Sequence, residues 1–215
     1  MKRFSNRYML LYSLGIAAVV ALLLSVVAMG LKDKQNANVR NEKMQTLLAT
    51  IGVECERDAA PQLYGQYFKE EITIESSGKK LPLFLFEKDG KKGYVIPAKG
   101  KGLWGGIYAN IALGSDFNTI VGITFSHDSE TPGLGAEITT DAFCKQFVGK
   151  KILDNEGKVV SVSVVKHADP ASLHQVDAIS GGTMTSNGVN DMLAACLESY
   201  SEYIERVAAQ GNENK

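Results

Sequence analysis

Hydrophobic and polar residues are unevenly distributed along the chain, and the longest apolar run lies near the N-terminus. The segment from Met9 to Leu31 contains no charged residue. As a helix with ~1.5 Å of rise per residue it spans roughly 34 Å, enough to cross the hydrocarbon core of a bilayer. A cleaved signal peptide is the alternative, since Ala28-Met29-Gly30 resembles a cleavage site, but the apolar region of such a peptide is only ~7–15 residues long. The pattern therefore predicts a transmembrane helix over 9–31 that is retained in the mature protein.

The residues after this segment predict a stalk that leads into a folded domain. A polar stretch runs from Asp33 to Glu42, and apolar residues then recur at helical spacing from Met44 until Gly52 ends the pattern. Basic residues lie on both sides of the transmembrane segment, so only the small size of the N-terminal tail indicates that the domain is translocated. We expect a short cytoplasmic tail, the transmembrane helix, a stalk helix or linker, the domain and a polar tail, with boundaries at 1–8, 9–31, 32–52, 53–210 and 211–215.

Between Ile72 and Phe125 the pattern becomes that of strands. Five runs rich in β-branched and aromatic residues are separated by turn signals such as Asp89-Gly90, and they read ITIES, LFLFE, GYVIP, IYANIAL and TIVGITF. Further along, the pattern predicts a short helix over 140–148, a strand over 159–165 and a closing amphipathic helix that includes 189–204. This order of elements predicts a single α+β domain of antiparallel strands with flanking helices.

Composition narrows the possible functions. The 215 residues are 45% hydrophobic and 22% charged, which fits one ordinary domain plus a short appendage. A formal net charge of −1 without a basic stripe gives no reason to expect a nucleic-acid partner. Cys55, Cys144 and Cys196 lie far apart and the histidines are not at metal-ligand spacing, so no metal site is expected. The GxSxG string of hydrolases and the HExxH string of metalloproteases do not occur.

The first candidate motif is the string DAISGGTMTS, from Asp177 to Ser186, which precedes the closing helix. Two adjacent glycines let the backbone approach a ligand closely, and the free amides of a helix start favour an anion such as a phosphate. The alternative is a Ser/Thr-rich helix cap, which needs only one side-chain oxygen. The pattern alone favours the cap, because such helix starts are common.

The second motif is ETPGLGAE, from Glu130 to Glu137, which follows a predicted strand. Its proline fixes one backbone angle, while Gly133 and Gly135 allow a tight loop with exposed amides. The loop is either a simple connection or a ligand-holding loop in which Thr131 and backbone amides donate hydrogen bonds. His127, shortly before this loop, is expected to be exposed rather than part of a site.

The third motif is GKGLWGG, from Gly100 to Gly106, which contains the only tryptophan of the chain. Trp104 either packs into the core, which is the default for a lone tryptophan, or walls an apolar pocket for a flat ring. None of the three glycine-rich stretches is a phosphate loop with Gly-Lys-Ser/Thr, or a GxGxxG between strand and helix. ATP and free dinucleotides are therefore not expected ligands.

Together the three motifs resemble those of the FMN-binding domain family, whose signature is Asp-x-x-Ser/Thr-Gly-Ala-Thr with FMN esterified to the final threonine. The string DAISGGT places this attachment on Thr183, with Gly182 where the family usually has alanine. GKGLWGGIYANIAL and FSHDSETPGLGAEI, with the single N-terminal span and the full length, are similar to the C subunits of sodium-translocating NADH:quinone oxidoreductases. The G subunits of Rnf ferredoxin:NAD complexes share the anchor, the TPGLG loop and the flavinylation string, but the GLWG string is more typical of the former.

The resemblance implies an electron-transfer subunit with one covalent FMN, attached by a separate flavin transferase that uses FAD and magnesium. It implies a bacterial inner-membrane complex of six subunits that oxidises NADH, reduces quinone and exports sodium. The main domain then lies on the periplasmic side, and this chain has no NADH or quinone site, no catalytic residue and no metal ligand. The implied flavin contacts, besides Thr183, are Ser180, Gly181, Gly182, Thr185, Leu103, Trp104, Glu130, Thr131, Gly133, Leu134 and Gly135.

An alternative from another functional class is a membrane-tethered sensory or binding module that holds a flavin non-covalently. Such a module has no reason to contain the string from Asp177 to Thr183. The string therefore favours the covalent electron carrier.

Overall fold

The computed structural model of the chain describes residues 5–76 and 78–213. The predicted tails at 1–8 and 211–215 therefore lie partly outside the described residues. The chain forms two compact units, Met1–Lys43 and Met44–Lys215. The division falls inside the predicted stalk at 32–52, since the residues from Met44 onward pack into the larger unit.

A single long helix, α1 (Asn6–Thr50), begins the described chain. Its apolar N-terminal part is exposed throughout, and within the described residues α1 alone is long and apolar enough to cross a membrane. The polar stretch from Asp33 to Glu42 is helical rather than an irregular linker. Gly52 follows the helix with a left-handed φ of +70°, a conformation that glycine adopts without steric cost.

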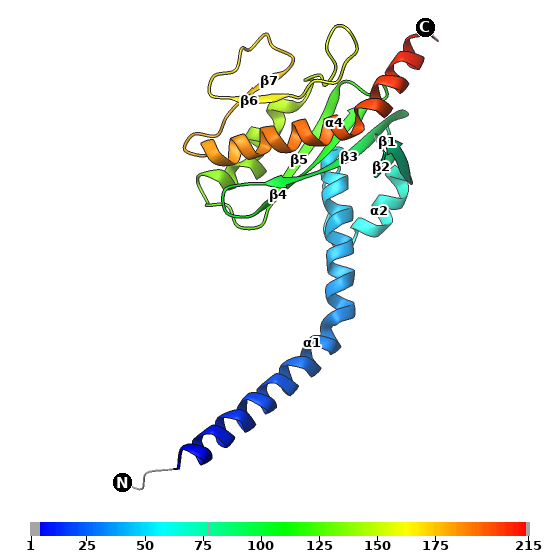
Figure 1. The fold of residues 1–215 in the computed structure, drawn as a ribbon. Coiled ribbons are helices and arrows are strands. Elements are labelled where there is room, and N and C mark those ends of the chain that lie inside the picture. Colours follow the sequence, from blue (N-terminus) through cyan, green and yellow to red (C-terminus); the bar gives the residue numbers. More distant parts are fainter. Residues whose placement is uncertain (1–4, 77, 214–215) are drawn as a thin grey trace. The chain divides into compact units, whose positions relative to one another are not determined.

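An antiparallel sheet of five strands forms the centre of the larger unit (Figure 1). Its strands are β1 (Phe68–Ser76), β2 (Lys79–Lys88), β3 (Lys91–Lys101), β4 (Gly106–Gly114) and β5 (Ile120–His127), in the order of the chain. All five predicted strands are confirmed. Asp89 and Gly90 both adopt positive φ, 52° and 71°, which is the two-residue hairpin turn that the sequence indicated.

Alternation along the strands buries both faces of this sheet. One face packs against the closing helix α4 (Thr183–Glu213), through residues such as Leu83, Ile96 and Ile111. The other face packs against the last turns of α1 and the short helix α2 (Ala60–Tyr67), through Phe84 and Val95. Because the side-chain period of a strand is two, neighbouring residues enter different cores.

The segment between the sheet and α4 is mostly irregular. It contains the 3₁₀ turns η1 (Gly135–Thr139) and η2 (Lys145–Phe147), the helix α3 (Asp141–Cys144), and the parallel pair β6 (Ser163–Val165) and β7 (Gln175–Asp177). The helix predicted over 140–148 is thus one α-helical turn followed by a 3₁₀ turn. Its predicted start is confirmed, since Thr140 caps it by accepting a hydrogen bond from the Phe143 amide.

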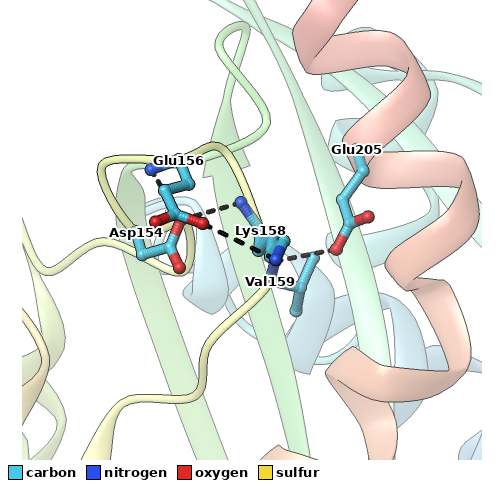
Figure 2. A network of polar contacts seen from close by, with 5 residues as sticks. All are labelled: Asp154, Glu156, Lys158, Val159 and Glu205. Atoms are coloured by element: carbon cyan, nitrogen blue, oxygen red, sulfur yellow. Dashed lines mark hydrogen bonds and ion pairs between the residues drawn. The ribbon is translucent and has the colours of Figure 1, made fainter.

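The strand predicted over 159–165 forms only at its end, 163–165. The Val159 amide donates to the Glu205 carboxylate of α4 at 2.9 Å (Figure 2), and the pairing of Val159 with Leu153 is only an isolated β-bridge. Asp154 closes the preceding turn by accepting hydrogen bonds from the amides of Glu156 and Lys158. The alternating valines are therefore held by a turn and a helix, and α2, η1 and β7 are elements that the pattern did not predict.

Candidate functional site

The three motifs meet in space, although they are far apart in the sequence. The β3–β4 connection, the loop after β5 and the start of α4 surround a small pocket of about 120 Å³. Its lining is Leu103, Glu130, Thr131, Leu134, Gly135, Gly181, Gly182, Thr183, Met184 and Thr185. Of the residues expected at a site, Trp104, Gly133 and Ser180 do not line the pocket but directly adjoin residues that do. Met184 lines it and was not expected from the sequence.

Thr183 is the first residue of α4, whereas the sequence placed it just before the helix. The Ser186 amide donates to the Gly182 carbonyl at 2.8 Å, which closes the first helical turn. Within the described chain, the amides of Thr183, Met184 and Thr185 donate no hydrogen bond to another residue. These free amides and the positive end of the helix dipole make the start of α4 a suitable place for an anion.

The four hydroxyl residues at this helix start have different environments. Thr185 is 2% exposed, and its hydroxyl donates to Glu130 Oε2 at 2.5 Å. Ser186 is equally buried, and its oxygen accepts a hydrogen bond from the Ile179 amide at 3.3 Å. Ser180 and Thr183 are exposed. Of the four hydroxyls, only those of Ser180 and Thr183 can therefore be reached from solvent.

Glu130 is a buried carboxylate of the second motif, and it links the other two motifs. It is 4% exposed, and besides the Thr185 hydroxyl it accepts a hydrogen bond from the Trp104 amide, at Oε1 and 2.9 Å. Burial by itself would raise the pKa of this carboxyl, but the hydrogen bonds from Thr185 and from the amides of the 103–105 segment outweigh burial and lower the pKa. The group is therefore ionised at neutral pH.

The TPGLG loop satisfies part of its own amides. Leu134 and Ala136 both donate to the Thr131 carbonyl at 3.1 Å, and Gly133 donates to Glu137 Oε1 at 3.1 Å. Several of the expected ligand donors in this loop are thus engaged within it. The amides of Thr131 and Gly135 have no acceptor in the described chain. A Cβ built on Gly182 would lie 3.5 Å from the Gly135 nitrogen, so the Gly135 amide lies beside the start of α4.

Large apolar side chains at the pocket are exposed to solvent. Trp104 is 67% exposed, so the expectation that this lone tryptophan packs into the core is wrong. Leu103, Leu134 and Met184 are also exposed, and all three line the pocket. Exposed apolar groups gathered at one pocket are typical of a binding surface. His127 is half-buried, and its Nδ1 accepts a hydrogen bond from the Glu130 amide at 3.3 Å.

Other parts of the described chain offer weaker sites. A larger hollow of about 710 Å³ lies at the β2–β3 and β4–β5 turns, but Lys88 in it already donates to the carbonyls of Ile51 and Gly52. No group of three or more metal-ligating side chains occurs among the described residues. The three cysteines are free and half-buried, and burial raises the pKa of the Cys196 thiol to about 12.

The chain is similar to a known protein family, to curated relatives and to solved structures. Residues 102–198, which contain all three loops of the pocket, match the family model of the FMN-binding domain. The chain is 32% identical to the C subunit of the Na(+)-translocating NADH-quinone reductase of Vibrio parahaemolyticus, over 82% of this chain and 84% of that protein. The crystal structure of the C subunit from Parabacteroides distasonis is similar, with a TM-score of 0.74, 36% identity and coverage of 82% of this chain and 96% of that one. Shewanella oneidensis NqrC, at 24% identity and a TM-score of 0.65 over 79% of this chain and 98% of that one, shares the fold.

Proposed function

Because the chain belongs to the family of C subunits of Na(+)-translocating NADH-quinone reductases, we propose that it carries one FMN covalently, through the phosphate, on the hydroxyl of Thr183. In this role it is an electron-transfer subunit of a membrane complex that couples NADH oxidation and quinone reduction to sodium export. The match of residues 102–198 to the FMN-binding domain supports the choice of cofactor.

Thr183 is assigned as the attachment residue because its hydroxyl is accessible. An enzyme that modifies a side chain has to reach its oxygen, and Thr185 and Ser186 are buried and hydrogen-bonded. Of the two exposed hydroxyls, Ser180 lies before the helix, while Thr183 lies in its first turn beside the free amides. A phosphate on Thr183 is therefore stabilised by the helix start, and the Gly135 amide lies close enough to contribute.

Attachment is a group transfer from FAD, catalysed by a separate flavin transferase with magnesium. The Thr183 oxygen forms a bond to the phosphorus of the FMN half, the bond from that phosphorus to the bridging oxygen breaks, AMP leaves, and the hydroxyl proton is released. No electrons are gained or lost. The chain gains the mass of one FMN less one water, and the phosphodiester keeps one negative charge.

The size of the pocket fits the phosphate end of the cofactor better than its ring system. Sites that enclose a whole drug-sized ligand have volumes of about 300–1,000 Å³, whereas this pocket has about 120 Å³. The exposed side chains of Leu103, Trp104 and Leu134 would hold the flat ring outside this pocket. Bound FMN supplies one- and two-electron redox chemistry, and the apolar side chains shield one face of the ring from water.

The remaining parts of the proposal concern location and partners. Helix α1 anchors the chain in the bacterial inner membrane, with the domain from 53 to 210 on the periplasmic side. The partners are the other five proteins of a complex of six subunits, and they hold the NADH and quinone sites. A covalent link suits a carrier outside the cytoplasm, where a lost cofactor cannot be replaced.

The test uses the protein purified from its native host. We expect it to be yellow and to stay yellow after denaturation and dialysis, because the link is a covalent ester. Loss of all colour on dialysis would instead favour the non-covalent flavin-binding module. Identification of the proteins that copurify with the chain tests its place in the complex.

A further inference from the structure

Glu130 has an unusual position, because it is buried at the edge of the pocket and joins elements that are distant in sequence. Oε1 accepts from the Trp104 amide at 2.9 Å, and Oε2 accepts from the Thr185 hydroxyl at 2.5 Å. Glu130 itself belongs to the loop after β5, so one side chain holds the three motifs together. Its exposed fraction of 4% leaves almost none of it in contact with solvent.

Two glycines make room for this carboxylate. A Cβ on Gly102 would lie 2.5 Å from Glu130 Oε1, and a Cβ on Gly135 would lie 2.5 Å from Glu130 Oε2 and even closer to the Thr185 hydroxyl. Real Cβ atoms do not approach oxygen atoms this closely. Glycine at both positions therefore lets the backbone of two loops close around one buried anion.

In the first turn of α4, Thr185 is buried against Glu130 whereas Thr183 is exposed. Successive residues of an α-helix are about 100° apart around its axis, so Thr183 and Thr185 project about 200° apart. When Glu130 holds Thr185 toward the interior, Thr183 is directed to the opposite side, which agrees with its exposure. The hydrogen bond to Glu130 also engages the hydroxyl of Thr185, the second threonine of the string DAISGGTMTS.

We propose that Glu130 is a positioning residue for flavin attachment: by binding the Thr185 hydroxyl and the Trp104 amide, it presents the Thr183 hydroxyl and places the apolar 103–104 segment beside it. This inference rests on the proposed attachment of FMN to Thr183. It assigns to Glu130 a role through Thr185, rather than the direct flavin contact that the family resemblance implies. Burial and the lowered pKa of the carboxyl are consistent with this role, since the ionised form accepts both hydrogen bonds.

The experiment measures the initial rate at which the full chain, in detergent, gains one FMN less one water from a flavin transferase with FAD and magnesium. Glu130→Gln keeps the shape but loses the charge and one acceptor. Thr185→Val keeps the shape but loses the hydroxyl, and Thr185→Ser restores it. Glu205→Gln is the matched control, because this carboxylate also accepts a backbone amide, that of Val159 (Figure 2), but lies far from Thr183 along α4.

We expect Glu130→Gln and Thr185→Val each to slow attachment at least about tenfold, the factor that corresponds to about 1.4 kcal/mol. The double variant should be no slower than the slower single variant, because both changes break the same contact. Thr185→Ser should return close to the wild-type rate, and Glu205→Gln should match it. The fluorescence of the single tryptophan should change in Glu130→Gln, where its amide loses a charged acceptor.

Four outcomes distinguish the possibilities. Wild-type rates in both Glu130→Gln and Thr185→Val, alongside lowered thermal stability, would make the carboxylate a structural link only and overturn the inference. Additive effects in the double variant would also overturn it, because Glu130 would then act independently of Thr185. Should Glu130→Gln fail to fold, the attachment rates of Thr185→Val and Thr185→Ser test the inference alone. A wild-type rate in Thr185→Val would then overturn it. If the wild type never gains the mass, the proposed attachment itself fails, whatever the variants do.

Discussion

Replacing Gly135 with alanine should destabilise the domain strongly. The new Cβ would lie 2.5 Å from Glu130 Oε2 and closer still to Thr185 Oγ1, both of which are buried. Overpacking in a tightly packed region costs about 1–3 kcal/mol, and disruption of a hydrogen bond to a charged group costs about 1.5–3 kcal/mol. With roughly 2–4 °C lost per kcal/mol in a domain of this size, the midpoint of thermal unfolding should fall by about 5–24 °C.

The assay is thermal unfolding of the full chain in detergent, followed by the near-ultraviolet circular dichroism of its aromatic side chains. Gly133→Ala is the matched control from the same loop. Gly133 has a φ of +75°, and nothing lies within 4 Å of a Cβ there. Its replacement introduces only left-handed backbone strain, which costs about 1–2 kcal/mol.

Gly135→Ala should therefore lower the midpoint clearly more than Gly133→Ala. Adding Thr185→Ala to Gly135→Ala should recover part of the loss, because it removes the closest oxygen. Equal effects of the two glycine variants, or a Gly135→Ala protein as stable as the wild type, would refute the close packing around Glu130.

Three further predictions concern pH, the apolar surface and the anchor. The pKa of Glu130 is lowered in the folded state, so its stabilising contribution is complete above the ordinary glutamate pKa of about 4.3 and is lost as the pH falls through the lowered value. Glu130→Gln should therefore lose less stability than the wild type as the pH falls below about 4.3. Trp104→Ala and Leu134→Ala should alter the fluorescence or redox potential of the attached flavin while the covalent link still forms, and native values in both variants would place the ring elsewhere. Mass spectrometry of the mature chain should show that 9–31 is retained, and protease added to the cytoplasmic face of oriented vesicles should not cleave beyond Lys32.

The sequence predicted the sheet well because its signals are local. Each strand carries its own alternation, and the Asp89-Gly90 turn needs positive φ at both residues, which this pair tolerates. Elements that depend on partners distant in the sequence were either not predicted or predicted to be too long. Val159 starts an apparently good strand, yet its amide bonds to Glu205, 46 residues later, and α2 is too short to have a clear hydrophobic period.

The candidate site was predicted as three motifs, but its internal arrangement was not. Nothing local indicates that Thr185 bonds to Glu130, 55 residues earlier, or that this separates Thr185 from Thr183. The exposure of Trp104 contradicts the core packing that is the default for a lone tryptophan and agrees with the alternative, that it walls a pocket. Met184 was missed as well, although an apolar residue between two threonines at a helix start is a signal that could have indicated it.

The most direct test of the central claim is the intact mass of the chain after co-expression with a flavin transferase. The wild type should gain the mass of one FMN less one water, Thr183→Ala should not, and Thr185→Ala should still gain it, though more slowly. Thr183→Ser should gain it wherever the transferase accepts a primary hydroxyl. A Thr183→Ala protein that carries the added mass while Thr185→Ala lacks it would contradict the assignment of the attachment residue, and a wild type that never carries it would contradict covalent attachment altogether.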